Sequence, residues 1–221
     1  MSTQSAKHGP RVHDVVRIDP AALRPDVEER PPWAGDMLSR APFAVIRRGT
    51  SPTGMLPVGI RGAERAQRWA AFCSVEGFLT IYRPEDLLHR GASHTRLSEA
   101  PAFDALKLLR DRWEGHSLNW GPTGSVGFEL ATGCLTVTQS SDLDLVIRAD
   151  NPLSISDAAY LLCQADGLPA VVDIRVETPF CGFSLCEFVR EGSRNILLRY
   201  PSAAIIGDYP WRELQRWEVH A

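Results

Sequence analysis

Lysine is almost absent from this sequence, and so is any excess of positive charge. Only Lys7 and Lys107 are lysines among 24 basic residues, which face 27 acidic residues and leave a formal net charge of −3. Proteins that bind nucleic acid non-specifically are usually basic, so the overall charge does not support that class. The dominance of arginine has two explanations, coding bias or a need for guanidinium groups that fit phosphate oxygens.

Long apolar stretches are missing as well. No run of about 18 apolar residues occurs, so we expect no membrane-spanning helix. The first ten residues, MSTQSAKHGP, lack the apolar core of a signal peptide. We therefore expect a cytoplasmic protein.

The cysteines lack the pattern of a disulfide framework or a zinc site. They are odd in number and scattered, which favours reduced, buried thiols. There is no C-x-x-C pair and no pair of histidines at ligand spacing, so we do not expect zinc. The five positions are Cys73, Cys134, Cys163, Cys181 and Cys186.

The sequence does contain a mixture of strand and helix patterns, which predicts an α+β fold. Short apolar runs predict strands at 44–48, 56–60, 81–82, 117–120, 143–147, 170–176, 183–189 and 195–199. Helical spacing of apolar residues predicts helices at 62–72, 84–89, 101–113 and 156–164. Small and polar residues at 90–100 indicate a linker. We therefore expect a smaller N-terminal α/β domain over residues 1–92 and a second domain over residues 93–221.

Two acidic residues, Asp142 and Asp144, stand two positions apart in SSDLDLVIRAD. On a strand they leave the same face, with Leu143 and Leu145 directed into the core. Two carboxylates held that close repel each other unless a cation lies between them, and Mg²⁺ accepts one or two carboxylates together with substrate phosphates. The alternative is a solvated strand end, because a chain with this many aspartates contains such a pair by chance.

The flanking sequence favours the metal-binding interpretation. The upstream stretch LNWGPTGS ends in Gly124 and Ser125, which allow backbone amides and a hydroxyl to approach a phosphate. Downstream, Asp173 interrupts an apolar strand, where an unpaired carboxylate is costly to bury. Its partner is either a metal ion or a nearby cation, Arg175 or Arg199.

Together these features resemble the nucleotidyltransferase superfamily, which includes polymerase-β-like enzymes. The resemblance implies a mixed sheet with flanking helices over residues 93–221. It matches the metal-binding carboxylates to Asp142, Asp144 and Asp173, and the phosphate-binding turn to Gly124-Ser125. The spacer VGFELATGCLTVTQSS between turn and first aspartate is longer than usual in that superfamily, so we expect it to hold extra structure.

A longer resemblance covers nearly the whole chain. WGPTGSVGFELATG followed by SSDLDLVI is similar to the phosphoribosyl-dephospho-CoA transferases of malonate decarboxylase, also called its holo-acyl-carrier-protein synthases. The stretches HDVVRI, PVGIRGAERAQRWAAF and YPW extend the similarity toward both ends. It implies an enzyme that transfers the 5-phosphoribosyl-dephospho-CoA group from 2′-(5″-triphosphoribosyl)-3′-dephospho-CoA to a serine of the apo acyl-carrier subunit, with release of diphosphate and no nucleic-acid or membrane partner.

The same resemblance implies a role for each site residue. Asp142 and Asp144 would hold Mg²⁺ against the triphosphate, as the first two carboxylates of the pattern. Asp173 would help bind a second ion that activates the carrier serine. Ser125 and the amides near Gly124 would hold the terminal phosphates.

Three arginines in the N-terminal domain, Arg61, Arg65 and Arg68, are spaced four and three residues apart, so on a helix they share one face. They are candidates for a clamp on the diphosphate or on the CoA moiety. The alternative is a solvated helix face, with Glu64 offsetting part of the charge.

Three other functions fit parts of the pattern. A nucleotidyltransferase that uses ATP would share the metal-binding carboxylates, and only the spacer and the N-terminal domain argue against it. A glycosyltransferase also uses Asp-x-Asp, but it needs neither the Gly-Ser turn nor the third aspartate. An inactive binding subunit of a decarboxylase complex would have no reason to keep three carboxylates together.

Overall fold

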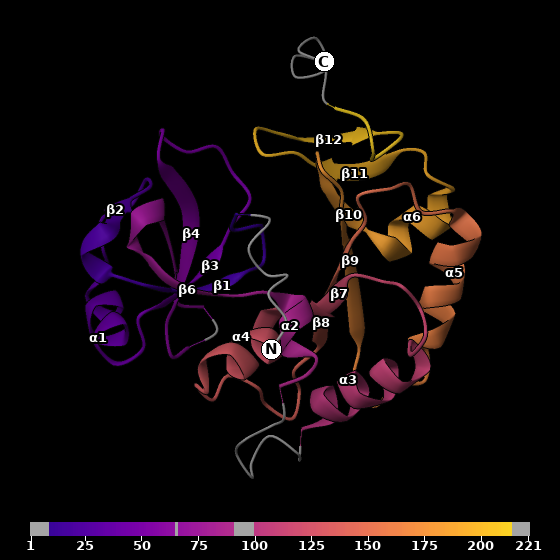
Figure 1. Cartoon of the computed structure of the whole chain (residues 1–221), viewed down its shortest axis with the longest axis horizontal. Coiled ribbons are helices and arrows are strands. Elements are labelled where there is room, and N and C mark those ends of the chain that lie inside the picture. The colour runs from indigo at the N-terminus through magenta and orange to yellow at the C-terminus, as the bar shows by residue number, and fades with distance from the viewer. Residues whose placement is uncertain (1–8, 65, 91–99, 214–221) are drawn as a thin grey trace. The chain divides into compact units, whose positions relative to one another are not determined.

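The structure is a computed structural model that describes residues 9–64, 66–90 and 100–213. The chain divides into two compact units, Met1–Arg83 and Pro84–Ala221, and each is considered by itself (Figure 1). The division falls after Arg83, whereas the sequence placed the domain boundary after residue 92. Within the described residues each unit combines helices with a six-stranded sheet, which confirms the α+β class.

The N-terminal unit is built on a sheet with the strand order β2-β5-β4-β3-β1-β6, in which every pairing is antiparallel. The strands are β1 (Val15–Ile18), β2 (Leu23–Pro25), β3 (Phe43–Ile46), β4 (Met55–Arg61), β5 (Arg68–Ser74) and β6 (Phe78–Tyr82). Helix α1 (Pro32–Arg40) and the 3-10 turns η1 (Pro20–Ala22) and η2 (Val75–Gly77) accompany them. The core is formed by buried side chains that include Ala34, Leu38, Val58, Ile60, Trp69 and Ala71.

The helix predicted over residues 62–72 is wrong, because this stretch is a hairpin turn followed by β5. The buried positions of β5 are Trp69, Ala71 and Cys73, a period of two that belongs to a strand. The Gly62 amide donates to the Gln67 carbonyl at 2.9 Å and closes the turn. Pairing with β4 along seven residues outweighs the local helix propensity of the alanines.

The C-terminal unit has a mixed sheet with the order β12-β11-β10-β9-β8-β7, in which β8 and β9 are parallel and the other pairings antiparallel. The strands are β7 (Trp120–Pro122), β8 (Leu143–Arg148), β9 (Val172–Glu177), β10 (Gly182–Ser184), β11 (Ile196–Arg199) and β12 (Ala204–Gly207). The helices are α2 (Pro84–Leu87), α3 (Pro101–Arg112), α4 (Gly124–Thr132), α5 (Ile155–Gln164) and α6 (Leu185–Glu191). Helices α3, α5 and α6 lie along one side of this sheet, and α2 and α4 lie on the other (Figure 1).

Helix α5 connects the parallel strands β8 and β9. Its first turn is capped by Ser154, whose hydroxyl accepts a hydrogen bond from the Asp157 amide at 3.0 Å. Apolar residues of β8, β9, α3, α5 and α6 form the core between the sheet and these helices. This core fixes the two strands on which the predicted carboxylates lie.

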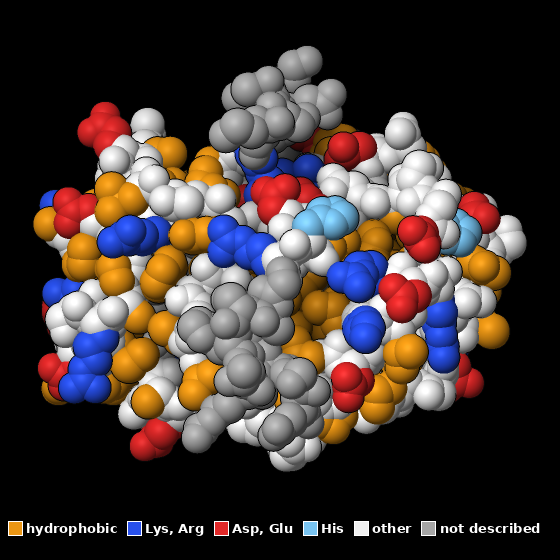
Figure 2. Space-filling view, turned by 60° about the horizontal axis from the view of Figure 1, so that its bottom comes forward, with side chains coloured by type: hydrophobic (Ala, Val, Ile, Leu, Met, Phe, Trp, Pro, Cys, Tyr) orange, Lys and Arg blue, Asp and Glu red, His pale blue; other side chains and the backbone are white. Residues whose placement is uncertain are grey.

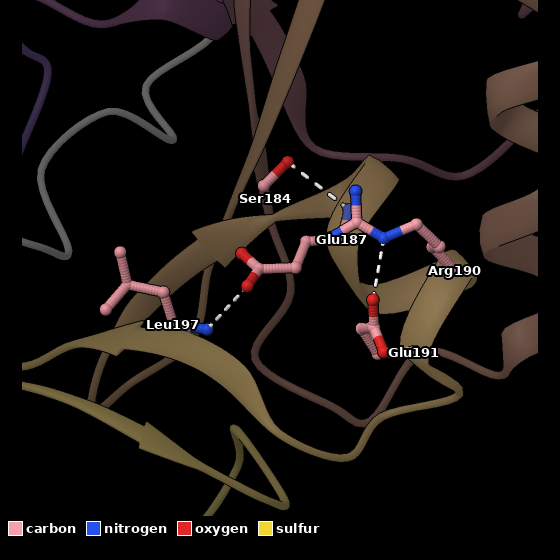
Figure 3. Close-up of polar contacts among 5 residues, drawn as sticks. All are labelled: Ser184, Glu187, Arg190, Glu191 and Leu197. Atoms are coloured by element: carbon pink, nitrogen blue, oxygen red, sulfur yellow. Dashed lines mark hydrogen bonds and ion pairs between the residues drawn. The ribbon is translucent and has the colours of Figure 1, made fainter.

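The strand predicted over residues 183–189 is also only partly correct, because β10 ends at Ser184 and α6 follows directly. The Ser184 hydroxyl accepts from the Glu187 amide at 3.5 Å and caps the helix (Figure 3). The apolar residues at Leu185 and Phe188 suit either a buried strand or a short helix, so the capping serine decides.

Three expectations from composition can be compared with the structure. Among the described residues, no helix has the length and apolar character needed to cross a membrane. All five cysteines are free, but only Cys73 and Cys181 are buried. Burial raises the pKa of the Cys73 thiol to about 11, so this thiol is neutral at physiological pH. On the face shown in Figure 2, side chains of both charges are interspersed.

Candidate active site

Strands β8 and β9 present one apolar face and one polar face. Residues paired across two parallel strands project to the same side of the sheet, so the register defines what each face carries. Leu145 and Ile174 are paired on the face that α3 and α5 cover. The opposite face, here called the polar ladder, consists of the pairs Asp144–Asp173, Val146–Arg175 and Arg148–Glu177.

The first pair of the polar ladder brings together two of the predicted carboxylates. Asp144 and Asp173 are direct register partners, and both are partly exposed. Asp142 immediately precedes β8 and is exposed. The open end of the ladder therefore presents acidic groups from two adjacent strands to solvent.

Gly124 lies directly against Asp144. The amide of the preceding residue, Thr123, donates to the Asp144 carbonyl at 2.8 Å. Gly124 has φ of +57°, and a methyl group at this position would overlap the Asp144 carboxylate. Only glycine satisfies both constraints. The sequence-predicted turn and the sequence-predicted aspartate are thus neighbours in space.

Ser125 stands in the first turn of α4, where backbone N–H groups have no partner within the helix. The helix occupies the first part of the long spacer, which confirms that the spacer holds extra structure. The Ser125 carbonyl accepts from the Thr136 hydroxyl at 2.9 Å. The Glu129 carboxylate, 3% exposed, accepts from the amides of Thr136 and Val137 at 2.7 and 2.6 Å. These bonds fix the loop that leads to Asp142.

Asp173 has a cation within reach, as one of the sequence-based alternatives proposed. The Arg175 guanidinium contacts the Asp173 carboxylate at 3.0 Å, and the two side chains are 36% and 41% exposed. Arg199 lies on β11, two strands away from β9, with β10 between them. The ion pair therefore forms along β9 and is open to solvent.

The far end of the polar ladder is closed. The side chain of Arg148 is 1% exposed and contacts the Glu85 carboxylate at 3.2 Å. Glu85 belongs to α2, which covers this end. A methyl group at Gly121 would overlap the α2 backbone, so β7 and α2 meet closely. Glu177, the register partner of Arg148, is also buried.

The carboxylates at the open end suit a hard cation. Carboxylate oxygens are the ligands that Mg²⁺ takes from proteins, usually one or two of them, while water and substrate phosphates complete its shell. Asp142 and Asp144 meet that requirement. Within the ranges that the structure describes, no three His, Cys, Asp or Glu side chains gather closely enough to hold a metal ion. The third carboxylate, Asp173, is engaged by Arg175.

Glu187, an acidic residue at the start of α6, has a structural role. Its carboxylate accepts from the Leu197 amide at 3.0 Å and ties α6 to β11 (Figure 3). The nearby ion pair of Arg190 and Glu191, at 2.7 Å, lies on the exposed side of the same helix. Glu187 thus serves the packing of α6, and Asp173 remains the candidate for the third position.

Two family models match this chain. The model described as the phosphoribosyl-dephospho-CoA transferase MdcG C-terminal domain matches residues 87–208, and the one described as its N-terminal domain matches residues 11–80. The chain belongs to the phosphoribosyl-dephospho-CoA transferase family. It is therefore an enzyme, a transferase, as the sequence patterns had indicated.

Curated relatives agree with the family models over most of the chain. A phosphoribosyl-dephospho-CoA transferase from Pseudomonas putida is 34% identical over 209 residues, which is 95% of this chain and 98% of the relative. One from Pseudomonas aeruginosa is 34% identical and covers 92% and 95% of the two chains. One from Klebsiella pneumoniae is 34% identical and covers 91% and 96%. No solved structure matches the chain.

The arginines predicted in the N-terminal part of this transferase have a different arrangement from the one expected. Arg61 and Arg68 are direct partners across the β4–β5 hairpin instead of neighbours on a helix. Arg65 lies outside the described residues. Like charges directly opposite on two strands repel. The role of the three arginines in donor binding stays a prediction.

Sequence reasoning missed two residues that shape the site. One is Glu129, whose carboxylate anchors the spacer loop. Arg148 was not singled out at all. A charged residue at the end of an apolar strand is the signal that would have drawn attention to it, because a buried charge requires a partner.

Proposed function

We propose that this transferase moves the 5-phosphoribosyl-dephospho-CoA prosthetic group from 2′-(5″-triphosphoribosyl)-3′-dephospho-CoA to a serine of the apo acyl-carrier subunit of malonate decarboxylase. The observation that carries the proposal is the position of Asp144, which lies against Gly124 at the start of α4 and opposite Asp173 on β9. The names of the relatives support the transferred group, because they specify phosphoribosyl-dephospho-CoA.

The proposed reaction exchanges one phosphorus–oxygen bond for another. The carrier serine Oγ bonds to the phosphorus attached to the ribose 5″ oxygen, and the bond from that phosphorus to the diphosphate breaks. The serine proton is lost, diphosphate leaves, and a phosphodiester links the carrier to the ribose. Transfer of this kind depends mainly on positioning and on stabilisation of negative charge.

Magnesium is the cofactor that we propose, held by Asp142 and Asp144 with Asp173 as a third carboxylate. When bound, it would screen the negative charge of the triphosphate and of the departing diphosphate. Asp144 is the best placed of the three, since the backbone of Thr123 and the contact with Gly124 fix its position. Asp142 adds an exposed carboxylate immediately before the strand.

The first turn of α4 is the proposed binding site for the terminal phosphates. The backbone amides of this turn and the Ser125 hydroxyl are hydrogen-bond donors, and the helix dipole favours an anion at this end. The absence of a side chain at Gly124 lets the start of this turn approach the Asp144 carboxylate closely. The bond from Thr136 to the Ser125 carbonyl holds this turn in place while the phosphates bind.

Asp173 is proposed to act on the carrier serine. A carboxylate opposite Asp144 is well placed to orient the attacking hydroxyl and to accept its proton. Its ion pair with Arg175 directs the carboxylate along β9. In this proposal Asp142 and Asp144 act on the donor, and Asp173 acts on the acceptor.

The compartment that we propose for the reaction is the cytoplasm. All five cysteines are free thiols, a state that reducing compartments favour. The proposed partners are the apo carrier subunit and the triphosphoribosyl donor, with neither nucleic acid nor a membrane required.

Mass spectrometry of the carrier tests the proposal. The purified transferase is mixed with apo carrier subunit, Mg²⁺ and the triphosphoribosyl donor, and a parallel sample receives ATP in place of the donor. We expect the carrier to gain the mass of the prosthetic group in the first sample and no mass in the second. Modification by ATP would establish another nucleotidyltransferase. Donor binding without any modification would indicate an inactive binding subunit. Either result overturns the proposal.

A further inference from the structure

Arg175 occupies a position on β9 that its ion pair with Asp173 does not fully explain. The two side chains leave the same face of the strand, two residues apart, and meet at 3.0 Å. Across the ladder, the register partner of Arg175 is the apolar Val146. The guanidinium group therefore stands next to the acidic end of the ladder, with an uncharged residue on its other side.

Because this ion pair is exposed, a dissolved anion can readily replace Asp173 as the partner of Arg175. Pairs between exposed side chains contribute little to stability, because water and salt compete for both partners. With more than a third of each side chain exposed, a dissolved anion has access to Arg175. A guanidinium fork also matches the oxygens of a phosphate group, which it binds through two hydrogen bonds at once.

Arg148 provides the contrast on the same face. It is the other cation of the polar ladder, yet its side chain is 1% exposed and its contact with Glu85 lies under α2. An incoming anion cannot reach it without displacing a helix. Of the two cations on the ladder, Arg175 is the one that a ligand can contact.

We propose that Arg175 is a phosphate-binding residue, and that Asp173 occupies its guanidinium group until the ligands bind. When a metal ion engages the Asp173 carboxylate, the guanidinium loses its partner and turns to the phosphate oxygens of the donor or of the departing diphosphate. This inference rests on the proposed function, since it assumes that a phosphate ligand and a divalent cation meet at the Asp144–Asp173 end.

If Arg175 changes partner in this way, Mg²⁺ and diphosphate bind cooperatively. In the absence of metal, Asp173 competes with the anion for Arg175 and repels it. Once the carboxylate is neutralised, both effects disappear, so each ligand increases the affinity for the other. A purely structural ion pair predicts no such coupling through Arg175.

Calorimetric titration with inorganic diphosphate tests the assignment without any catalytic step. In the presence of Mg²⁺, Arg175→Gln is expected to weaken diphosphate binding roughly 10- to 100-fold, because a charge-assisted hydrogen bond is lost. Arg175→Lys is expected to restore part of it. Arg190→Gln is the matched control, because Arg190 is also an exposed, ion-paired arginine of this unit (Figure 3). Equal affinities for Arg175→Gln and the control would overturn the proposal.

A second variant tests whether the Asp173 carboxylate competes with diphosphate for Arg175. In EDTA, Asp173→Asn is expected to bind diphosphate several-fold more tightly than the wild type, because the competing carboxylate is gone. The double variant Asp173→Asn with Arg175→Gln is expected to lose that gain. If the double variant retains it, the gain comes from reduced repulsion alone and Arg175 is not the anion ligand.

The two proposals fail in different ways. If the carrier is never modified but the diphosphate titrations behave as described, the assignment of donor and acceptor is wrong and Arg175 remains a phosphate ligand. If the carrier is modified normally by Arg175→Gln and its diphosphate affinity is unchanged, the transfer stands and the inference about Arg175 falls.

Discussion

The two ends of the polar ladder use the same pair of strands for opposite purposes. At one end, Asp144 and Asp173 face each other in partial contact with solvent, and Asp173 forms an ion pair with Arg175 that water can reach. At the other end, Arg148 is buried against Glu85 beneath α2. Charged side chains are open to ligands at the first end and buried against the fold at the second. Burial, and not residue type, separates site from scaffold.

The largest effect is expected at the open end. Asp144→Asn removes one of the two carboxylates that are proposed to hold the metal, and we expect carrier modification to slow about a thousandfold or more. Asp142→Asn is expected to act in the same direction. Neither change should lower the melting temperature, because neutralising one charge relieves repulsion. Near wild-type turnover in both variants would contradict the metal assignment.

The closed end is expected to respond in stability. Arg148→Met keeps the aliphatic stem but leaves the carboxylates of Glu85 and Glu177 without this cation, and breaking a buried pair costs about 3–5 kcal/mol of unfolding free energy. Urea denaturation measures this loss. An unchanged midpoint would mean that the buried pair contributes nothing to the fold.

Substitutions at two glycines test the contact between Asp144 and the start of α4. Gly124→Ala is expected to cost about 1–2 kcal/mol for the left-handed backbone and, in addition, to displace Asp144 and impair transfer. Gly167→Ala is the control, since Gly167 has φ of +68° with open space around it. The control should lose similar stability and keep its transfer rate. Equal rates in the two variants would show that the contact with Asp144 is unimportant.

A buried titratable group in the N-terminal core, the Cys73 thiol, is expected to make the unfolding free energy depend on pH. The pKa of the Cys73 thiol is raised from 9.0 to about 11 by burial first and by Asp19 second. The folded state therefore favours the protonated thiol, so its contribution to stability is complete below pH 9 and is lost as the pH rises toward about 11. The difference in unfolding free energy between wild type and Cys73→Ala should shrink over that window. A constant difference would show that this thiol does not titrate differently on folding.

The sequence predicted the parts of the site that depend on local alternation. Asp142 and Asp144 followed from the alternation of aspartate and leucine at the start of β8, and the Gly-Ser turn was found because glycine is distinctive. The sequence does not decide whether Arg175 or Arg199 is the cation that pairs with Asp173, because strand order is not visible in a single sequence. The structure places Arg199 two strands away and Arg175 on the same strand.

Two predictions of secondary structure failed for a related physical reason. Residues 62–72 and 183–189 contain apolar spacing that fits both a helix and a strand. In the first case, pairing with β4 selects the strand. In the second, the Ser184 cap selects the helix. Long-range pairing therefore decides the first segment and a capping side chain decides the second, and the apolar spacing alone encodes neither.

The most direct test compares the two ends of the ladder in one assay. Apo carrier, Mg²⁺ and the triphosphoribosyl donor are mixed with excess Asp144→Asn or Arg148→Met enzyme, and the rate of carrier modification per folded molecule is measured by mass spectrometry in a single turnover. The account predicts that Asp144→Asn retains about a thousandth of the wild-type rate or less, while Arg148→Met stays within a few-fold of wild type. A normal rate for Asp144→Asn, with loss of transfer in folded Arg148→Met, would contradict it.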